Sequence, residues 1–299
     1  MPAAGEGRID CRAIAGRIRQ TVSSAYPLKI ISPLASSTVS ATSETTALLP
    51  SVAFILSYGG GIVHGDRILV HASVHPGCAL LLLTQGSTKV FRQRNSTSKP
   101  SLGNDQTFQT MHLHVANNSL LCVLPDPVTC FKGARYNQRQ AVTIQKGGSL
   151  ILLDWMTSGR MSRGERWEFE KYFSVNVVRL EDGELAIRDA LLLEQEQLAE
   201  KLVDVDAFAY LIILGPAVEF IASSLLEKHQ DERIRPARST SIQPLVKWSI
   251  SPISHKQIQG VTVRAACKRT DELKLWIKSH LEPLQHIIGD SAWSMYLNN

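Results

Sequence analysis

A cluster of glycines is the most conspicuous candidate for chemistry in this sequence: Gly59, Gly60, Gly61 and Gly65. A loop that cradles phosphate needs the pattern G-x-x-x-x-G-K-[ST], but these glycines lead to Asp66, whose negative charge would repel phosphate. Nucleotide binding is therefore disfavoured. Two interpretations stay open. Either the glycines form a tight turn that requires positive φ, or they let a partner approach the backbone, with Asp66 presented as an oxygen ligand or a hydrogen-bond acceptor.

A second candidate is the loop at residues 154–166 (DWMTSGRMSRGER), which combines Trp155 with Arg160 and Arg163. Trp and Arg are enriched at the hot spots of protein interfaces, so this loop is a candidate recognition surface. The alternative is an internal corner in which arginines pair with Asp154 and Glu165. The sequence leaves both interpretations open.

The histidines and cysteines form no recognisable metal or catalytic motif. His71 and His75 would lie about 13 Å apart on a strand, too far to share an ion, and His112 and His114 about 7 Å apart. The five cysteines are widely spaced without a C-x-x-C pair, which favours buried thiols over a disulfide framework or a zinc site. A hydrolase has no supporting motif either, since G-x-S-x-G and H-E-x-x-H are both missing from the sequence.

Strands are the elements that must position these residues. Residues 67–75 alternate apolar and polar side chains, the pattern of a half-buried strand, and residues 78–83 form a short apolar run typical of a strand buried on both faces. Glycine-containing turns at residues 146–148 and 181–183 predict hairpins. The expected fold is mainly β, with many short strands in stacked or sandwiched sheets. Further strands are predicted at residues 88–92, 109–115, 119–123, 136–144, 149–155, 168–180, 184–193 and 261–266.

Two helices are expected in the last third of the chain. One begins at Pro216, because proline is favoured at the first helical position, and carries an apolar stripe from Val218 to Leu225. The other begins near Thr270, and Pro283 kinks or ends it.

Three further segments are less regular. Residues 99–104 read as a polar loop and residues 228–241 as a mobile loop. Residues 190–203 have helical propensity, but we expect a strand in their first part. No internal repeat of 20 to 50 residues is visible.

Composition and charge limit the remaining possibilities for domain number, ligand class and compartment. The 299 residues fit a single domain over residues 1–299, because mainly β domains often reach this size. The net charge of +5 permits nucleic-acid binding, and the stretch 132–171, with eight basic residues against four acids, makes a basic RNA-binding module the alternative function. No apolar run is long enough for a transmembrane helix. Residues 1–20 lack the pattern of a secretory signal, so the cytosol is the expected compartment.

Several motifs together resemble those of the urease accessory protein family called UreD or UreH. The resemblance covers about four fifths of the chain, whereas residues 1–50 match it weakly. The matching runs, in order, are YGGGIVHGD (58–66), PGC (76–78), LLLLTQGSTKVFR (80–92), LPDPVTCFKGARYNQRQ (124–140), LLDWMTSGRMSRGERW (152–167), LGP (214–216) and residues 260–266.

The resemblance implies a non-enzymatic chaperone or scaffold that helps to insert nickel into apo-urease. It implies partners too: a helical accessory protein of the UreF type, a GTPase of the UreG type, and urease itself, with no nucleic acid and no membrane. GTP hydrolysis then belongs to a partner, in keeping with the lack of a phosphate loop. Members of the family are thought to offer nickel an interior passage. On this basis, Asp66 and Glu165 are expected beside that passage, because Ni²⁺ accepts oxygen ligands. No tightly bound cofactor is expected, only transient Ni²⁺.

Overall fold

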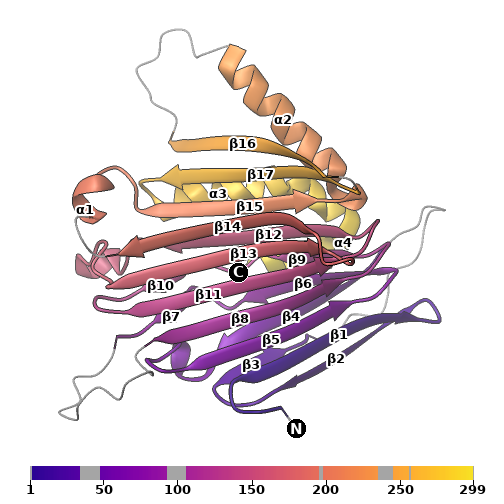
Figure 1. Cartoon of the computed structure of the whole chain (residues 1–299), viewed down its shortest axis with the longest axis horizontal. Coiled ribbons are helices and arrows are strands. Elements are labelled where there is room, and N and C mark those ends of the chain that lie inside the picture. Colours follow the sequence, from indigo (N-terminus) through magenta and orange to yellow (C-terminus); the bar gives the residue numbers. More distant parts are fainter. Residues whose placement is uncertain are drawn as a thin grey trace.

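The computed structural model describes residues 2–33, 48–92, 106–194, 198–234, 245–255 and 257–298. In this part of the chain, two β-sheets lie face to face and helices cover the outer side of the second sheet (Figure 1). The mainly β fold with sandwiched sheets, expected from the sequence, is confirmed.

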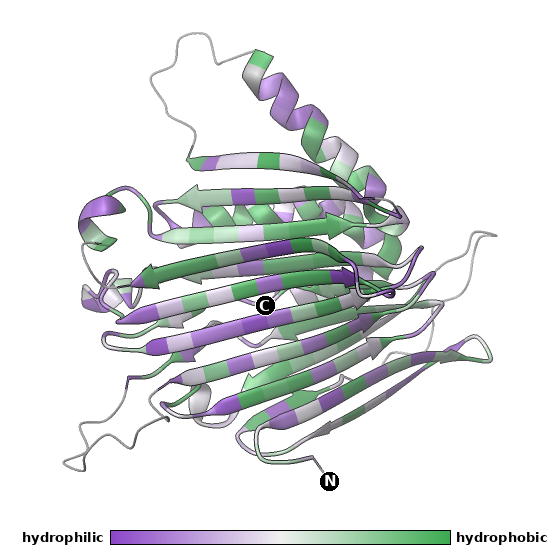
Figure 2. Cartoon of the chain, in the orientation of Figure 1, coloured by the Kyte–Doolittle hydropathy of each residue, from purple (hydrophilic) through white to green (hydrophobic). Residues whose placement is uncertain are grey.

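The first sheet contains seven described strands in the order β14-β13-β11-β8-β5-β1-β2. The strands from β13 to β1 pair in parallel, and only the edge strands β14 and β2 are antiparallel to their neighbours. Hydrophilic and hydrophobic residues alternate along these strands (Figure 2), because one face packs on the second sheet and the other meets water. The strands are β1 (Glu6–Ile14), β2 (Arg17–Ser24), β5 (Arg67–Val74), β8 (Thr107–Val115), β11 (Arg135–Ile144), β13 (Lys171–Leu180) and β14 (Leu185–Glu194).

The second sheet contains ten described strands, eight of them in the order β16-β17-β15-β12-β9-β6-β4-β3, with β10 beside β12 and β7 beside β10. Both faces of its centre are covered, so every residue of β6 and β12 is buried. This is why residues 78–83 read as a continuous apolar run. The strands are β3 (Leu28–Ile31), β4 (Leu49–Ser57), β6 (Cys78–Thr84), β7 (Thr88–Val90), β9 (Leu120–Val123), β10 (Val128–Cys130), β12 (Ser149–Thr157), β15 (Ala207–Leu214), β16 (Val246–His255) and β17 (Ile258–Cys267).

The chain winds between the sheets as a coil. Strands β5, β8 and β11 of the first sheet are each followed by a strand of the second sheet, β6, β9 and β12. Each turn of the coil therefore adds one strand to each sheet in the same direction, which gives the parallel pairing of neighbouring turns.

The corners of successive turns stack on one another. Gly77 donates its N–H to the carbonyl of Asn118 (2.7 Å), and Asn118 donates to the carbonyl of Gly147 (3.1 Å). All three residues have positive φ, at 80°, 45° and 80°, which Gly and Asn adopt most readily. The hairpin predicted at residues 146–148 is therefore wrong: the turn leads from one sheet to the other. The hairpin predicted at residues 181–183 is confirmed, because β13 and β14 pair antiparallel.

Two apolar cores result from this arrangement. Alternate residues of β12 point to opposite sides: Leu150 and Leu152 join the core between the two sheets, whereas Ile151 and Leu153 join the core under the helices. The β12 strand thus lies at the centre of a three-layer structure of sheet, sheet and helices. The charged residue of β12, Asp154, is therefore held inside the molecule.

The helical layer is larger than the sequence predicted. The two predicted helices are present, and a further helix, α4, follows Pro283. Residues 228–234 form the last turns of α2, so the mobile loop predicted for residues 228–241 is wrong there, and residues 235–241 lie outside the described ranges. The helices are η1 (Tyr58–Gly60), η2 (Met161–Arg163), α1 (Leu198–Lys201), η3 (Pro216–Val218), α2 (Glu219–Ile234), α3 (Thr270–Leu281), η4 (Glu282–Leu284) and α4 (Gln285–Leu297).

The remaining segments agree with the predictions from the sequence only in part. The strand expected in the first part of residues 190–203 is confirmed, since β14 ends at Glu194 and α1 follows. The loop predicted at residues 99–104 lies outside the described ranges. The N-terminal strands β1 to β4 were not predicted. None of the helices in the described ranges is both long and apolar enough to cross a membrane.

Candidate functional site

The two loops singled out in the sequence meet at one end of the sandwich. They line a common cavity of about 920 Å³, together with residues that follow β7 and β10. The first loop contributes Gly59 to the lining, and the second contributes Arg160, Arg163 and Glu165. The fold therefore joins residues about a hundred positions apart, a juxtaposition that the sequence alone did not indicate.

The glycine loop is held closely against its neighbours. Gly59, Gly60 and Gly65 have positive φ, as the tight-turn interpretation requires. A Cβ atom on Gly61 would lie 2.5 Å from the ring of Phe91 and 2.6 Å from the carbonyl oxygen of Lys89. The small residue at position 61 is thus explained by packing within this chain.

Asp66 closes its own turn. One carboxylate oxygen accepts the N–H of Val63 at 3.0 Å, and its backbone carbonyl accepts the N–H of Phe108 at 3.0 Å. Asp66 does not belong to the lining of the cavity. As a nickel contact it stays a prediction.

Glu165 is engaged by Arg160. The guanidinium contacts both carboxylate oxygens, one of them at 2.7 Å through Nε. This pair lowers the pKa of Glu165, so the side chain stays ionised but its charge is balanced. Arg160 also stacks over the ring of Phe131, 4.0 Å from its centroid. The internal-corner interpretation of this loop therefore holds for Arg160 and Glu165, whereas Arg163 is exposed.

Trp155 belongs to the core and not to the loop. It lies on β12, is 4% exposed, and joins the apolar core under the helices. Its indole N–H donates to the carbonyl of Pro125 at 2.8 Å. The interpretation of Trp155 as part of a recognition loop is wrong, because β12 continues to Thr157.

A buried carboxylate between the two sheets is the feature that the sequence analysis missed. Asp154 points from β12 toward the first sheet, where Gln138, Tyr172, Ser174 and Asn176 donate hydrogen bonds to it at 2.5 to 3.3 Å. All four donors are uncharged, so within the described ranges no cation balances the charge of the carboxylate. Burial raises the pKa of Asp154, even though the hydrogen bonds oppose the shift.

The raised pKa of Asp154 predicts a particular pH dependence of stability. The folded protein keeps the proton of the Asp154 carboxyl to higher pH than the unfolded chain, in which aspartates have a pKa of about 3.9. Stability from this group is therefore present below that pH and is lost as pH rises through the folded pKa. Urea denaturation of the wild type and of Asp154→Asn from pH 4 to 8 should show the wild type losing stability relative to the variant. Parallel curves would contradict the assignment.

A second buried carboxylate lies on the path from the sheets to the helices. Asp126 accepts a hydrogen bond from the Lys274 ammonium at 2.7 Å, while its other oxygen is buried with no partner among the described residues. It lines two internal cavities. One, of about 20 Å³, is shared with Asp154 and Gln138; the other, of about 10 Å³, is shared with Lys274 and Lys278.

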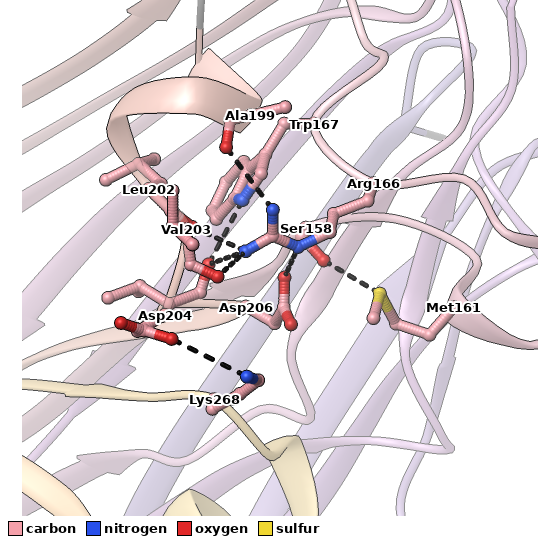
Figure 3. A network of polar contacts seen from close by, with 11 residues as sticks. Ser158, Met161, Arg166, Trp167, Ala199, Leu202, Val203, Asp204, Asp206 and Lys268 are labelled. Atoms are coloured by element: carbon pink, nitrogen blue, oxygen red, sulfur yellow. Dashed lines mark hydrogen bonds and ion pairs between the residues drawn. The ribbon is translucent and has the colours of Figure 1, made fainter.

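The loop after β12 is anchored by Arg166. Figure 3 shows its guanidinium pointing at Asp206 (2.5 Å) and at the backbone carbonyls of residues near the end of α1, including Val203 (2.6 Å). The neighbouring Trp167 donates its indole N–H to the carbonyl of Val205 at 3.0 Å. Arg166 thereby fixes one wall of the cavity without lining it.

Most of the basic stretch at residues 132–171 is neutralised by ion pairs. Five of its eight basic residues contact carboxylates, which leaves little free positive charge for a phosphate backbone. This disfavours the RNA-binding alternative. The pairs are Lys132–Glu168, Arg135–Glu170, Arg160–Glu165, Arg166–Asp206 and Lys171–Glu194.

Histidines and cysteines do not build a metal centre in the described part of the chain. No three His, Cys, Asp or Glu side chains come together there as a potential metal site. His71 instead stacks on His112 of the neighbouring strand, with ring centroids 5.2 Å apart. All five cysteines are free and buried, as expected.

Similarity to known proteins extends over nearly the whole chain. The family model described as UreD urease accessory protein matches residues 3–296, which include most of the N-terminal segment. Urease accessory protein D of Oryza sativa subsp. japonica is 33% identical over 96% of this chain and 94% of its own length. Urease accessory protein D of Arabidopsis thaliana is 31% identical (96% and 99%). Urease accessory protein UreD of Sorangium cellulosum is 35% identical (97% and 84%).

Proposed function

Because this chain belongs to the UreD family of urease accessory proteins and so has a role in urease maturation, we propose that it is a non-enzymatic scaffold for nickel insertion. It acts in the cytosol, in a complex with a helical partner of the UreF type and a GTPase of the UreG type, and contacts apo-urease. These partners are the ones that the resemblance of its motifs implies. Nickel is the cargo of this scaffold, not a resident cofactor.

The observation that carries the nickel role is the uncompensated carboxylate of Asp154. A buried charge without a cationic partner is destabilising and is usually retained for function. Here it stands between two sheets, among amide and hydroxyl side chains, and shares a small cavity with Asp126. Oxygen donors of this kind suit Ni²⁺ in transit, since two carboxylates are too few to hold the ion permanently.

The four acidic residues along the proposed passage differ in how strongly other groups of this chain already engage them. The carboxylates of Asp66 and Glu165 are engaged by Val63 and Arg160 of this chain, so they are the weaker nickel contacts. Asp154 and Asp126 are the stronger ones. Asp126 has an unpartnered oxygen and lies on the way to the helical layer, where Lys274 offers a cation that an arriving Ni²⁺ has to displace.

Reconstitution tests the proposed function directly. Urease subunits and the two partner proteins from the same organism are co-expressed with or without this chain at limiting nickel. Without the chain, urease is expected to lose most of its nickel and activity, because no scaffold joins the GTPase to urease. Nickel per urease active site is measured by mass spectrometry, and tagged chain is tested for co-purification of all three partners.

Excess nickel in the medium serves as the control, because it restores loading that is limited by delivery but not loading of a misfolded urease. Nickel-replete urease at limiting metal without this chain would refute the proposal.

A further inference from the structure

The cavity between the two loops carries an excess of positive charge. Four permanently charged cations line it, and two of them are paired: Arg160 with Glu165, and Lys132 with Glu168. Arg92 and Arg163 form no ion pair with any described residue, and both are exposed. Within the described part of the chain, the cavity therefore presents two guanidinium groups that have no ion-pair partner.

The two loops that form this cavity also carry exposed apolar side chains, of which Val63 lines the cavity itself. Tyr58, Val63 and Met161 belong to the two loops and are 50%, 51% and 48% exposed. Large side chains exposed together in this way mark surfaces that bind other proteins. Tyr, Met and Arg are also the residue types enriched in such interfaces, whereas Lys and Glu are depleted. The composition of this surface thus indicates a protein partner.

The packing of the cavity argues against other ligands. A nucleobase needs a free aromatic face for stacking, but Arg160 covers a face of Phe131, and Phe91 packs against that ring edge-on with centroids 4.9 Å apart. A metal cation is a weaker fit, because the excess of positive charge opposes its binding and Glu165, the carboxylate in the lining, is engaged by Arg160. A carboxylate fits, because its two oxygens match the donors of a guanidinium.

We propose that this cavity is the docking site for an acidic segment of a partner protein. Carboxylates of the segment bind Arg92 and Arg163, and apolar side chains next to them pack on Tyr58, Val63 and Met161. The cavity is large enough for several side chains of such a segment. This site does not depend on the proposed nickel role, because none of these residues lies among the interior carboxylates.

Fluorescence anisotropy with the full-length chain tests the site. The probe is a fluorescein-labelled peptide of twelve residues, made of four Glu-Glu-Leu triplets, at low salt. The double variant Arg92→Glu/Arg163→Glu is expected to weaken binding about tenfold or more, because it removes two attractive contacts and introduces repulsion. A peptide with Gln in place of Glu should bind similarly weakly, and added salt should weaken the wild type.

A matched control separates the site from net charge. Arg188→Glu/Lys247→Glu makes the same charge change at exposed residues outside the cavity, and binding should stay within about twofold of the wild type. Thermal melting checks that both variants are folded. The proposal is overturned if the wild type does not bind the acidic peptide or if both variants lose binding equally. It is also overturned if a twelve-nucleotide oligouridine binds through the same arginines as tightly as the peptide, since the site would then belong to nucleic acid.

Discussion

Asp154→Asn is expected to leave the accessory complex assembled and to lower the nickel content of urease about tenfold or more. The substitution keeps the size of the side chain but removes the only charge that the interior of the sandwich gains from β12. A loss of about 1.4 kcal/mol of attraction is enough to reduce occupancy by an ion tenfold. The measurement is nickel per urease after co-expression at limiting metal, with co-purification of the partners as the test of assembly.

Two further variants make this result specific. Leu152 lies on the same face of β12 and is fully buried, so Leu152→Val disturbs the packing of this core without a change of charge, and nickel loading should stay close to the wild type. Glu165→Gln should reduce loading less than Asp154→Asn, because Arg160 already balances the charge of Glu165. Unchanged nickel loading in Asp154→Asn would exclude the interior carboxylates as contacts for nickel in transit. A larger loss of nickel loading in Glu165→Gln than in Asp154→Asn would place the nickel route in the cavity between the two loops instead.

Gly215→Ala is expected to destabilise the protein by about 2 to 5 kcal/mol. Gly215 has a φ of 93°, which costs a residue with a Cβ about 1–2 kcal/mol. The added Cβ would also lie 2.2 Å from the carbonyl oxygen of Gly148, at the corner that leads into β12. Relief of such a backbone clash costs about 1–3 kcal/mol more. Urea denaturation measures the loss.

Gly183→Ala is the matched control for this prediction. Gly183 has a similar φ of 86° in the β13–β14 hairpin, but nothing lies within 4 Å of a Cβ placed there. Gly183→Ala should therefore lower the free energy of unfolding only by the cost of the positive φ, about 1–2 kcal/mol. Equal losses in the two variants would show that the backbone around residue 148 moves aside freely and that close packing is not required where β12 and β15 meet.

Local features of the fold could be predicted from the sequence. The alternation at residues 67–75 specified β5, the turn at residues 181–183 specified a hairpin, and Pro216 specified the start of a helix. Each of these signals is read within a few residues, because backbone preference and the direction of successive side chains are local properties. The order of the motifs was also enough to indicate the family.

Non-local pairing decided the rest. The turn at residues 146–148 has the glycines of a hairpin, yet it joins two sheets, because β11 and β12 find parallel partners from earlier turns of the coil. The same pairing buried Trp155 and brought the loop of Gly59 to that of Arg160. A positive-φ glycine is compatible with either turn, so the sequence could not distinguish them.

The candidate site shows this division most clearly. By itself, the sequence determined that an apolar strand leads into a segment rich in carboxylates and arginines, and it left Asp154 in that segment. Only the tertiary structure decided that Asp154 faces four uncharged donors from the other sheet, while Glu165 is neutralised by Arg160. The physical reason is that the charge state and accessibility of a carboxylate depend on the groups around it, and strands distant in sequence supply those groups at Asp154.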